Sequence, residues 1–323
     1  MQDKLFFLKG IGTMHLQVKK AILPVAGLGT RFLPITKAIP KEMLAIVDRP
    51  MIQLIVEEAF SSGISQIILI NGHHKGNIED FFDTNYELND LLSKKGDIAN
   101  LEILEKIEKR GFICSLRQKA ALGLGHAILC ARPLIGDEPF AVLLGDDLIF
   151  TDSHTPPALA QLVENYYKTG IAQVALMQVP QTEIHKYGAA EGVADPKNSR
   201  NFIINNLVEK PPKGTEKTDQ AVVGRYVLTP AIWGILEKLA PSNDGEIQLT
   251  DALVHLMKNE GLIGYRFCGS RVDAGDRIGY LRANLTHALL RQELRQDTLA
   301  LMKELLQEDS TSVNSRSTSS EKR

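Results

Sequence analysis

The chain has 323 residues, of which 44% are hydrophobic and 24% are charged, and its formal net charge is −2. This composition is typical of a soluble globular protein with one large α/β domain or two smaller domains, and it argues against a general nucleic-acid-binding protein. No apolar run reaches the roughly 20 residues that a membrane-spanning helix needs, and the three scattered cysteines favour reduced thiols in a cytoplasmic protein.

The first half of the chain alternates strand-like and helix-like patterns. Apolar, β-branched runs predict strands, and apolar residues at helical spacing between Pro50 and Gly63 predict a helix. In chain order we predict a strand at 18–25, this helix, a strand at 66–70, two short helices between 86 and 110, a strand at 112–118, a helix at 123–131 and a strand at 139–147. Strict alternation predicts a parallel sheet covered on both faces, with ligands beyond the carboxyl ends of its strands.

The second half of the chain is less regular. It contains strand patterns at 172–179, 201–210 and 221–228, amphipathic helices at 229–240 and 246–261, and one long helix pattern from Arg277 to about Leu306. The last segment, 307–323, is polar and rich in serine, so we expect a disordered tail. With residues 1–17 read as an N-terminal extension and no linker visible, we predict one domain over residues 18–306.

A glycine loop follows the first predicted strand directly. Gly27-Leu28-Gly29 resembles the start of a dinucleotide fingerprint, but Phe32 stands where the third glycine belongs, and no Gly-Lys-Ser/Thr follows as in a P-loop. Glycines allow close approach of the backbone, whose N–H groups can bind an anion. Arg31, Lys37 and Lys41 add three cations within a short distance along the chain. The loop therefore predicts a polyphosphate site.

Further motifs of the chain occur in a characteristic order. "GLGTRFLPITKAIPKEML" is followed by "GLGHAI", "VEKP", "VGRYVL", "DGEIQLTDA" and "DAGDRIGY", over roughly residues 18–290. In these motifs the chain resembles the sugar-1-phosphate nucleotidyltransferases, and among them the bacterial enzymes that use UTP and glucose 1-phosphate. The resemblance implies a Rossmann-like α/β/α sandwich with a mainly parallel central sheet and a β-rich sugar-binding portion, which agrees with the alternation of strands and helices.

The resemblance also implies a reaction. A phosphate oxygen of glucose 1-phosphate would attack the α-phosphorus of UTP, giving UDP-glucose and pyrophosphate, with Mg²⁺ as cofactor. The attacking oxygen is already an anion, so the protein must bring two anions together and neutralise their charge rather than supply a base. The family further implies a homodimer or homotetramer that binds neither nucleic acid nor membrane.

The motifs assign residues to each part of this reaction. Arg31 and Lys41 match the cations that bind the triphosphate and the leaving pyrophosphate, with Lys37 a weaker candidate, and Lys210 matches the cation for the sugar phosphate. The remaining assignments are Asp146 and Asp273 for the metal; Ala26, Gly27, Gly29, Thr30, Gln118 and Gly123 for the nucleotide; and Gly188, Glu209, Lys210 and Gly224 for the sugar. Gly145 and Leu122 depart from the usual pattern, where a proline and a cation often occur.

Other polar residues have simpler interpretations. Turn or cap roles are expected for Asp147, Asp152 and Asp276, and a packing or hydrogen-bonding role for His126. The adjacent His73 and His74 are expected in a polar turn, because side chains of neighbouring residues point apart.

Three alternatives remain open. The same chemistry could use another pair, such as dTTP or N-acetylglucosamine 1-phosphate, since a methyl-sized difference in a base changes affinity little. A catalytically silent protein could bind sugar nucleotides on the same fold, although the predicted metal and phosphate residues are all present. A nicotinamide-dependent oxidoreductase is disfavoured by the missing third glycine.

Overall fold

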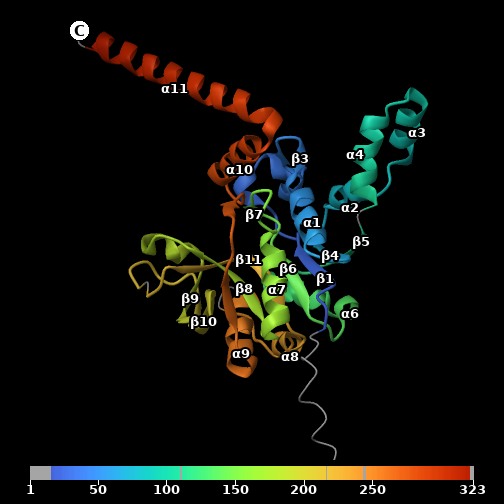
Figure 1. Cartoon of the computed structure of the whole chain (residues 1–323), viewed down its shortest axis with the longest axis vertical. Coiled ribbons are helices and arrows are strands. Elements are labelled where there is room, and N and C mark those ends of the chain that lie inside the picture. The colour runs from blue at the N-terminus through green and yellow to red at the C-terminus, as the bar shows by residue number, and fades with distance from the viewer. Residues whose placement is uncertain (1–15, 110, 216, 243–244, 321–323) are drawn as a thin grey trace, which may run out of the picture.

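A nine-stranded sheet forms the centre of the protein (Figure 1). The computed structural model describes residues 16–109, 111–215, 217–242 and 245–320, so nearly all of the expected extension at 1–17 lies outside the described residues. The strand order is β5-β4-β1-β6-β11-β8-β12-β10-β9. Its strands are β1 (Lys20–Pro24), β4 (Gln66–Asn71), β5 (Phe112–Arg117), β6 (Phe140–Leu143), β8 (Gln173–Gln178), β9 (Gly188–Asp195), β10 (Asn198–Glu209), β11 (Gln220–Leu228) and β12 (Ile263–Arg266).

Parallel pairing dominates the part of the sheet formed by the first half of the chain. Strands β5, β4, β1 and β6 are parallel neighbours, as the alternation of strands and helices predicts. Beyond β6 the pairing becomes mixed, because β11 runs antiparallel to both β6 and β8, while β8 and β12 are parallel. The long hairpin of β9 and β10 lies at the far edge and forms the β-rich portion.

Helices cover both faces of the sheet and produce the predicted α/β/α sandwich. Side chains alternate between the faces along each strand, so Leu23 of β1 packs in one apolar core and Ile22 in the other. The first core includes residues of α1 (Met51–Ser61), α2 (Gly76–Phe82), α7 (Ala158–Thr169) and α10 (Arg277–Leu290). The second includes α5 (Gly123–Cys130), α6 (Arg132–Ile135), α8 (Ala231–Leu236) and α9 (Leu249–Glu260). Among the described residues, no helix combines the length and the apolar character needed to cross a membrane.

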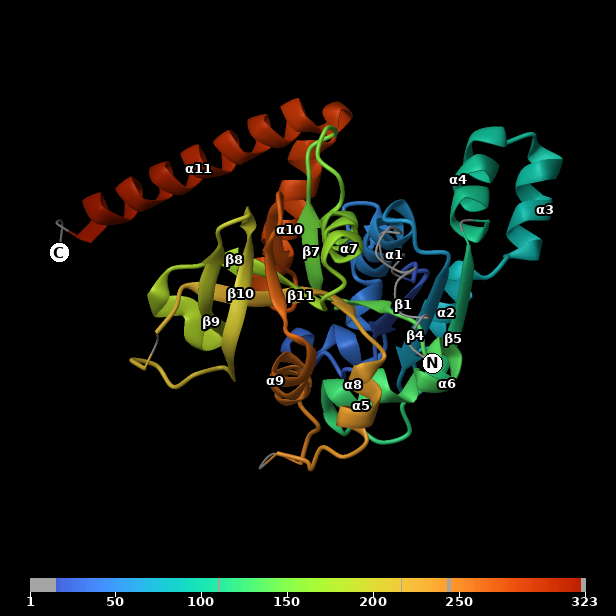
Figure 2. The same cartoon turned by 60° about the horizontal axis from the view of Figure 1, so that its bottom comes forward.

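Two helical segments extend from this body (Figures 1 and 2). The hairpin of α3 (Tyr86–Lys95) and α4 (Ile98–Glu108) is joined at Gly96, as predicted, and α11 (Gln292–Ser320) leads away from α10. The single helix predicted from Arg277 is interrupted, since Arg291 has an extended backbone with φ −82° and ψ 119°. Residues 307–320 are helical here, which differs from the expected disordered tail; in the structure the helix that begins at Gln292 continues through this segment.

Two small sheets complete the architecture. β2 (Ala45–Ile46) and β3 (Arg49–Pro50) form a short hairpin, and β7 (Asp147–Phe150) pairs with β13 (Ser270–Asp273). The second pairing joins Asp147 and Asp273 directly in register. The sequence pattern predicts neither β12 nor β13, each of which has four residues.

Candidate functional site

The carboxyl ends of the four parallel strands carry most of the predicted nucleotide and metal residues. The glycine loop follows β1, a turn at 72–75 follows β4, Gln118 follows β5, and Asp146 follows β6. Because parallel strands end at one edge of the sheet, these four segments become neighbours. The structure therefore places these residues at the edge of the sheet where the sequence analysis expects them.

The glycine loop is folded by short 3-10 turns: η1 (Thr30–Phe32), η2 (Ile35–Lys37) and η3 (Lys41–Met43). Gly29 adopts φ +66°, and a Cβ there would lie 3.1 Å from Thr36 Cγ2 and 3.2 Å from Lys41 Cβ. Thr36 Oγ1 also donates a hydrogen bond of 2.8 Å to the Gly29 carbonyl. A Cβ added at Gly27, by contrast, would meet nothing within 4 Å. The loop is thus closely packed at Gly29 and open at Gly27, where a ligand can approach the backbone.

Lys41 and Asp146 form a part-buried ion pair across the site. Lys41 Nζ lies 2.6 Å from Asp146 Oδ2. Burial is the largest single influence and lowers the pKa of Lys41, but Asp146, Glu42 and Asp273 together outweigh it and raise the pKa of the ammonium above 10.5. Burial likewise opposes ionisation of Asp146, and Lys41 beside it holds the pKa of the carboxyl below 3.8. Both groups are therefore charged at neutral pH.

The two predicted metal-binding carboxylates converge on a common point. A Cβ added to Gly275 would lie 2.9 Å from Asp146 Oδ2 and 2.9 Å from Asp273 Oδ1, and the Gly275 N–H donates to Asp273 Oδ1. Glycine at this position leaves the space between the carboxylates open. Two hard carboxylate oxygens facing one space fit a divalent cation such as Mg²⁺. Since the described residues contain no group of three or more potential metal ligands, further ligands would come from substrate or water.

All four predicted sugar residues line one cavity of about 340 Å³, together with Asp273: they are Gly188, Glu209, Lys210 and Gly224. Thr250 Oγ1 donates a hydrogen bond of 2.6 Å to Glu209 Oε2, and Lys210 Nζ lies 3.5 Å from Glu209 Oε1. The Gly224 N–H donates to Asp147 Oδ2, so this backbone group already has a partner within the protein.

A second cavity, of about 640 Å³, adjoins the first. Arg31 lines it with Lys186, Arg271 and Arg282, and Asp273 lines both cavities. The two cavities also share Lys186, Tyr187 and Arg271 among their lining residues. Lys37 and Thr30 are exposed on the glycine loop beside them.

Two of the predicted base-binding residues, Gln118 and Gly123, are joined by a hydrogen bond. Gln118 Nε2 donates to the Gly123 carbonyl at 3.1 Å and lies 2.9 Å from His126 Nδ1, which confirms the hydrogen-bonding role expected for His126. Gly123 has φ +89°, and a Cβ there would lie 2.8 Å from Glu246 Cβ. Ala26 approaches the turn after β4, since a Cβ at Gly72 would lie 3.0 Å from the Ala26 carbonyl oxygen.

Asp147 corrects an expectation from the sequence. It is a buried strand residue rather than a turn or cap, and its carboxylate accepts hydrogen bonds from the Gly224 N–H and from Arg271 Nε. Arg271 also lies 3.3 Å from Asp273 and 3.3 Å from the Tyr187 hydroxyl. Asp276 and Asp152 do act as predicted, the first as the N-cap of α10 and the second in a turn.

Several further residues near the site were missed from the sequence. Arg225 is fully buried and bonds both oxygens of Glu58 as well as the Asp147 carbonyl. Lys75 and Glu42 form a buried ion pair behind the glycine loop. Such pairs leave no signal in the sequence, because Arg225 and Glu58 lie 167 positions apart and Lys75 and Glu42 lie 33 positions apart.

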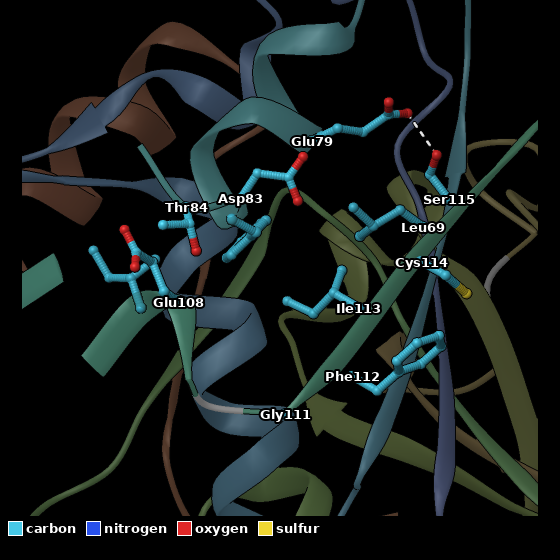
Figure 3. Close-up of a pocket in the computed structure, with 12 residues that line it drawn as sticks. Leu69, Glu79, Asp83, Thr84, Glu108, Gly111, Phe112, Ile113, Cys114 and Ser115 are labelled. Atoms are coloured by element: carbon cyan, nitrogen blue, oxygen red, sulfur yellow. Dashed lines mark hydrogen bonds between the residues drawn. The ribbon is translucent and has the colours of Figure 1, made fainter. Parts of the chain in front are cut away.

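A third cavity lies away from these residues (Figure 3). It has a volume of about 360 Å³ and lies among α2, α4 and β5, where Glu79 and Ser115 share a hydrogen bond of 2.6 Å. None of the predicted site residues lines it.

The chain is similar to known proteins both in sequence and in structure. The nucleotidyl transferase family model matches residues 20–288. The chain is 46% identical to UTP–glucose-1-phosphate uridylyltransferase of Bacillus subtilis (strain 168), over 91% of this chain and 99% of that protein. It resembles the structure of a UTP-bound UGPase from Acinetobacter baumannii at TM-score 0.82 and 40% identity, over 90% of this chain and 100% of that one. A UDP-glucose pyrophosphorylase complexed with UDP-glucose matches at TM-score 0.77 and 41% identity, over 85% of this chain and 100% of that one.

Proposed function

The chain belongs to the nucleotidyl transferase family, and on this premise we propose that it transfers the uridylyl group of UTP to glucose 1-phosphate. The products are UDP-glucose and pyrophosphate. The observation that carries the proposal is the meeting of Lys41, Asp146 and Asp273 beside the cavity of Glu209 and Lys210. A triphosphate on the glycine loop and a sugar phosphate in the cavity then adjoin one another.

The protein's part in this reaction is electrostatic. The sugar phosphate oxygen that attacks the α-phosphorus is an anion and needs no general base, whereas the approach of two anions needs positive charge. Lys41 is a protonated ammonium at neutral pH, because its pKa is raised above 10.5. We assign Lys41 and Arg31 to the triphosphate and the leaving pyrophosphate, and Lys210 to the sugar phosphate. Gly27, Gly29 and Thr30 would offer backbone groups to the nucleotide.

Asp146 and Asp273 would hold a divalent cation, which we propose to be Mg²⁺. The cation would neutralise phosphate charge during the transfer.

Substrate recognition divides between the two halves of the sheet. Ala26 and Gln118, which follow β1 and β5, and Gly123, at the start of α5, would receive the uridine. Glu209, oriented by Thr250 at 2.6 Å, would accept hydroxyl groups of glucose, with Gly188 and Gly224 beside it.

We further propose a homodimer or homotetramer, as the resemblance implies, which light scattering of the purified protein would test. The three cysteines are all free thiols. This supports the proposed cytoplasmic location, since cytosolic thiols are kept reduced.

The decisive experiment is pyrophosphate release by the purified protein with Mg²⁺, with UTP, dTTP, ATP and CTP each combined with several sugar 1-phosphates. Release restricted to UTP and glucose 1-phosphate is the expected result. Release with dTTP or with N-acetylglucosamine 1-phosphate would keep the chemistry and change the substrates. A folded protein that released no pyrophosphate with any pair would refute the proposal and favour a silent binding protein.

A further inference from the structure

A buried lysine in the turn after β4 contacts the glycine loop. Lys75 is 6% exposed and Glu42 is 1% exposed, and Lys75 Nζ lies 2.8 Å from Glu42 Oε2. Lys75 Nζ also donates to the Val25 carbonyl oxygen. Burial lowers the pKa of Lys75 below 10.5, and Glu42 opposes this shift. Because a buried ion pair often stabilises a protein no more than an apolar pair of similar size, stability alone is a weak explanation for it.

The two partners of Lys75 lie at the two ends of the glycine loop. Val25 is the residue that follows β1, and Glu42 belongs to η3, in which the loop ends. One ammonium group therefore holds the start and the end of the 25–42 segment together. The contacts of Lys75 Nζ with the Val25 carbonyl oxygen and with Glu42 are sufficient to join the two ends of the segment.

The lysine itself is fixed to the sheet. His74 has φ +61°, which turns the chain after β4, and Asn71 Nδ2 donates to the Lys75 carbonyl at 3.2 Å. Asn71 is the last residue of β4 and is 4% exposed. The glycine loop is thus attached, through Lys75, to the turn after β4, and Asn71 of β4 bonds this turn directly.

The contact between Lys75 and Glu42 affects the proposed reaction site through Lys41, the residue before Glu42. Lys41 precedes Glu42 and places its ammonium 2.6 Å from Asp146 Oδ2. Glu42 also packs against the residue before Asp146, since a Cβ at Gly145 would lie 3.3 Å from Glu42 Cγ. Displacing Glu42 would therefore displace Lys41 and disturb the chain that carries Asp146.

We propose that Lys75 is a positioning residue for the nucleotide loop, which acts through Glu42 and the Val25 carbonyl to hold Lys41 in place. The inference rests on the proposed function, because it assigns the loop to the triphosphate. It adds a residue that touches no substrate yet sets the affinity for UTP.

The test compares Lys75→Met with a matched control, Lys20→Met. Lys20 Nζ also bonds backbone carbonyls, those of Leu134 and Ile135, and pairs with Glu138 at 3.3 Å, but it lies at the amino end of β1. We expect Lys75→Met to weaken UTP binding, measured by calorimetry, by roughly 10- to 100-fold, as misplacement of a binding group by about 1 Å can do. The KM for glucose 1-phosphate should change far less. Lys20→Met should leave both constants unchanged.

A double variant separates positioning from stability. Glu42→Met/Lys75→Met removes both charges, so its melting temperature should recover relative to Lys75→Met, in which Glu42 stays buried and unpaired. We expect the double variant still to bind UTP weakly. Affinity for UTP equal to that of the parent, in either folded variant, would overturn the proposal.

Hydrogen exchange gives a readout that needs no activity. The amides of residues 26–41 should exchange faster in Lys75→Met and in the double variant than in the parent, while Lys20→Met should not change them. Unchanged exchange in the loop would contradict the proposal even if catalysis declined. If the parent itself released no pyrophosphate, the proposed function would fail, and the exchange data would still decide whether Lys75 holds the loop.

Discussion

Charge at a few side chains determines what this site can do. Lys41 and Asp146 are held in contact at 2.6 Å, and each shifts the pKa of the other toward its charged form. Asp273 faces the same space from β13, and Arg271 links it to the buried Asp147. The site thus combines fixed cations with two carboxylates that can accept a divalent cation, which is the arrangement that reactions between two phosphates need.

Replacing Asp146 should abolish most of the turnover while the fold survives. Asp146→Asn removes one of the two converging carboxylates with little change in shape. We expect pyrophosphate release to fall roughly 100- to 1,000-fold, as for the loss of other preorganised electrostatic groups. Asp152→Asn is the control, because Asp152 lies in a turn at the surface and its amide can still accept the His154 N–H. Turnover like that of the parent at saturating Mg²⁺ would contradict the metal assignment.

The Asp146 carboxyl should also affect stability in acid. Its folded-state pKa lies below 3.8, so its pairing with Lys41 stabilises the protein fully above that value and is lost as the pH falls through the folded pKa. The free energy of unfolding of the parent and of Asp146→Asn should therefore converge as the pH is lowered from about 6 to about 2 in denaturant titrations. A difference that stayed constant over this range would show that the pair contributes nothing to folding.

Among the elements, the short ones determine the site. The loop after β1 consists of the turns η1, η2 and η3, and β7 and β13 pair over only four residues each, yet their pairing sets Asp147 opposite Asp273. By contrast, α11, with 29 residues, packs on α10 and leads away from the sheet in both views (Figures 1 and 2). The length of an element therefore says little about its share in function.

Removal of the last segment tests this distinction. A chain that ends at Leu306 should release pyrophosphate at the same rate as the full chain and should melt at the same temperature, because α11 leads away from the cavities. The measurement is the assay described above together with thermal unfolding. A marked loss of either property would show that residues 307–323 contribute to the working protein and that the proposed domain limit at 306 is wrong.

At the scale of the whole molecule, our proposal assigns the two substrates to two halves of one sheet. The parallel strands β5, β4, β1 and β6 present the predicted nucleotide residues at their carboxyl ends, and the mixed part with β9, β10 and β11 forms the cavity that contains Glu209 and Lys210. Asp273 lines both cavities at the junction. In our proposal the reaction takes place where these halves meet.

Lys210→Ala should reveal this division in steady-state kinetics. We expect the KM for glucose 1-phosphate to rise about 10- to 100-fold, which corresponds to the loss of a charge-assisted hydrogen bond of roughly 1.5–3 kcal/mol. The KM for UTP should change much less. Lys213→Ala, an exposed lysine in the same loop, should leave both constants unchanged. A rise in the KM for UTP alone would mean that the two substrates are assigned to the wrong halves.

Much of this organisation follows from local patterns in the sequence. The apolar runs at 66–70 and 112–118 correspond to β4 and β5, and the helix from Pro50 to Gly63 corresponds to α1. Alternation of such elements implies parallel strands, and parallel strands bring their carboxyl ends to one edge. The glycine loop, Gln118 and Asp146 could therefore be placed at one site from the sequence, because each follows a strand of that kind.

The sequence by itself determined the class of fold, the edge of the sheet at which we propose the site and the charged residues available there. Only the tertiary structure decided which of these residues touch: Lys41 with Asp146, Lys75 with Glu42, and Arg271 with Asp147 and Asp273. The physical reason is that strand patterns depend on neighbours in the chain, whereas an ion pair depends on strand order and packing between residues far apart in sequence. The pairing of β7 with β13 and the buried role of Asp147 were missed for the same reason, since partners elsewhere in the chain create both.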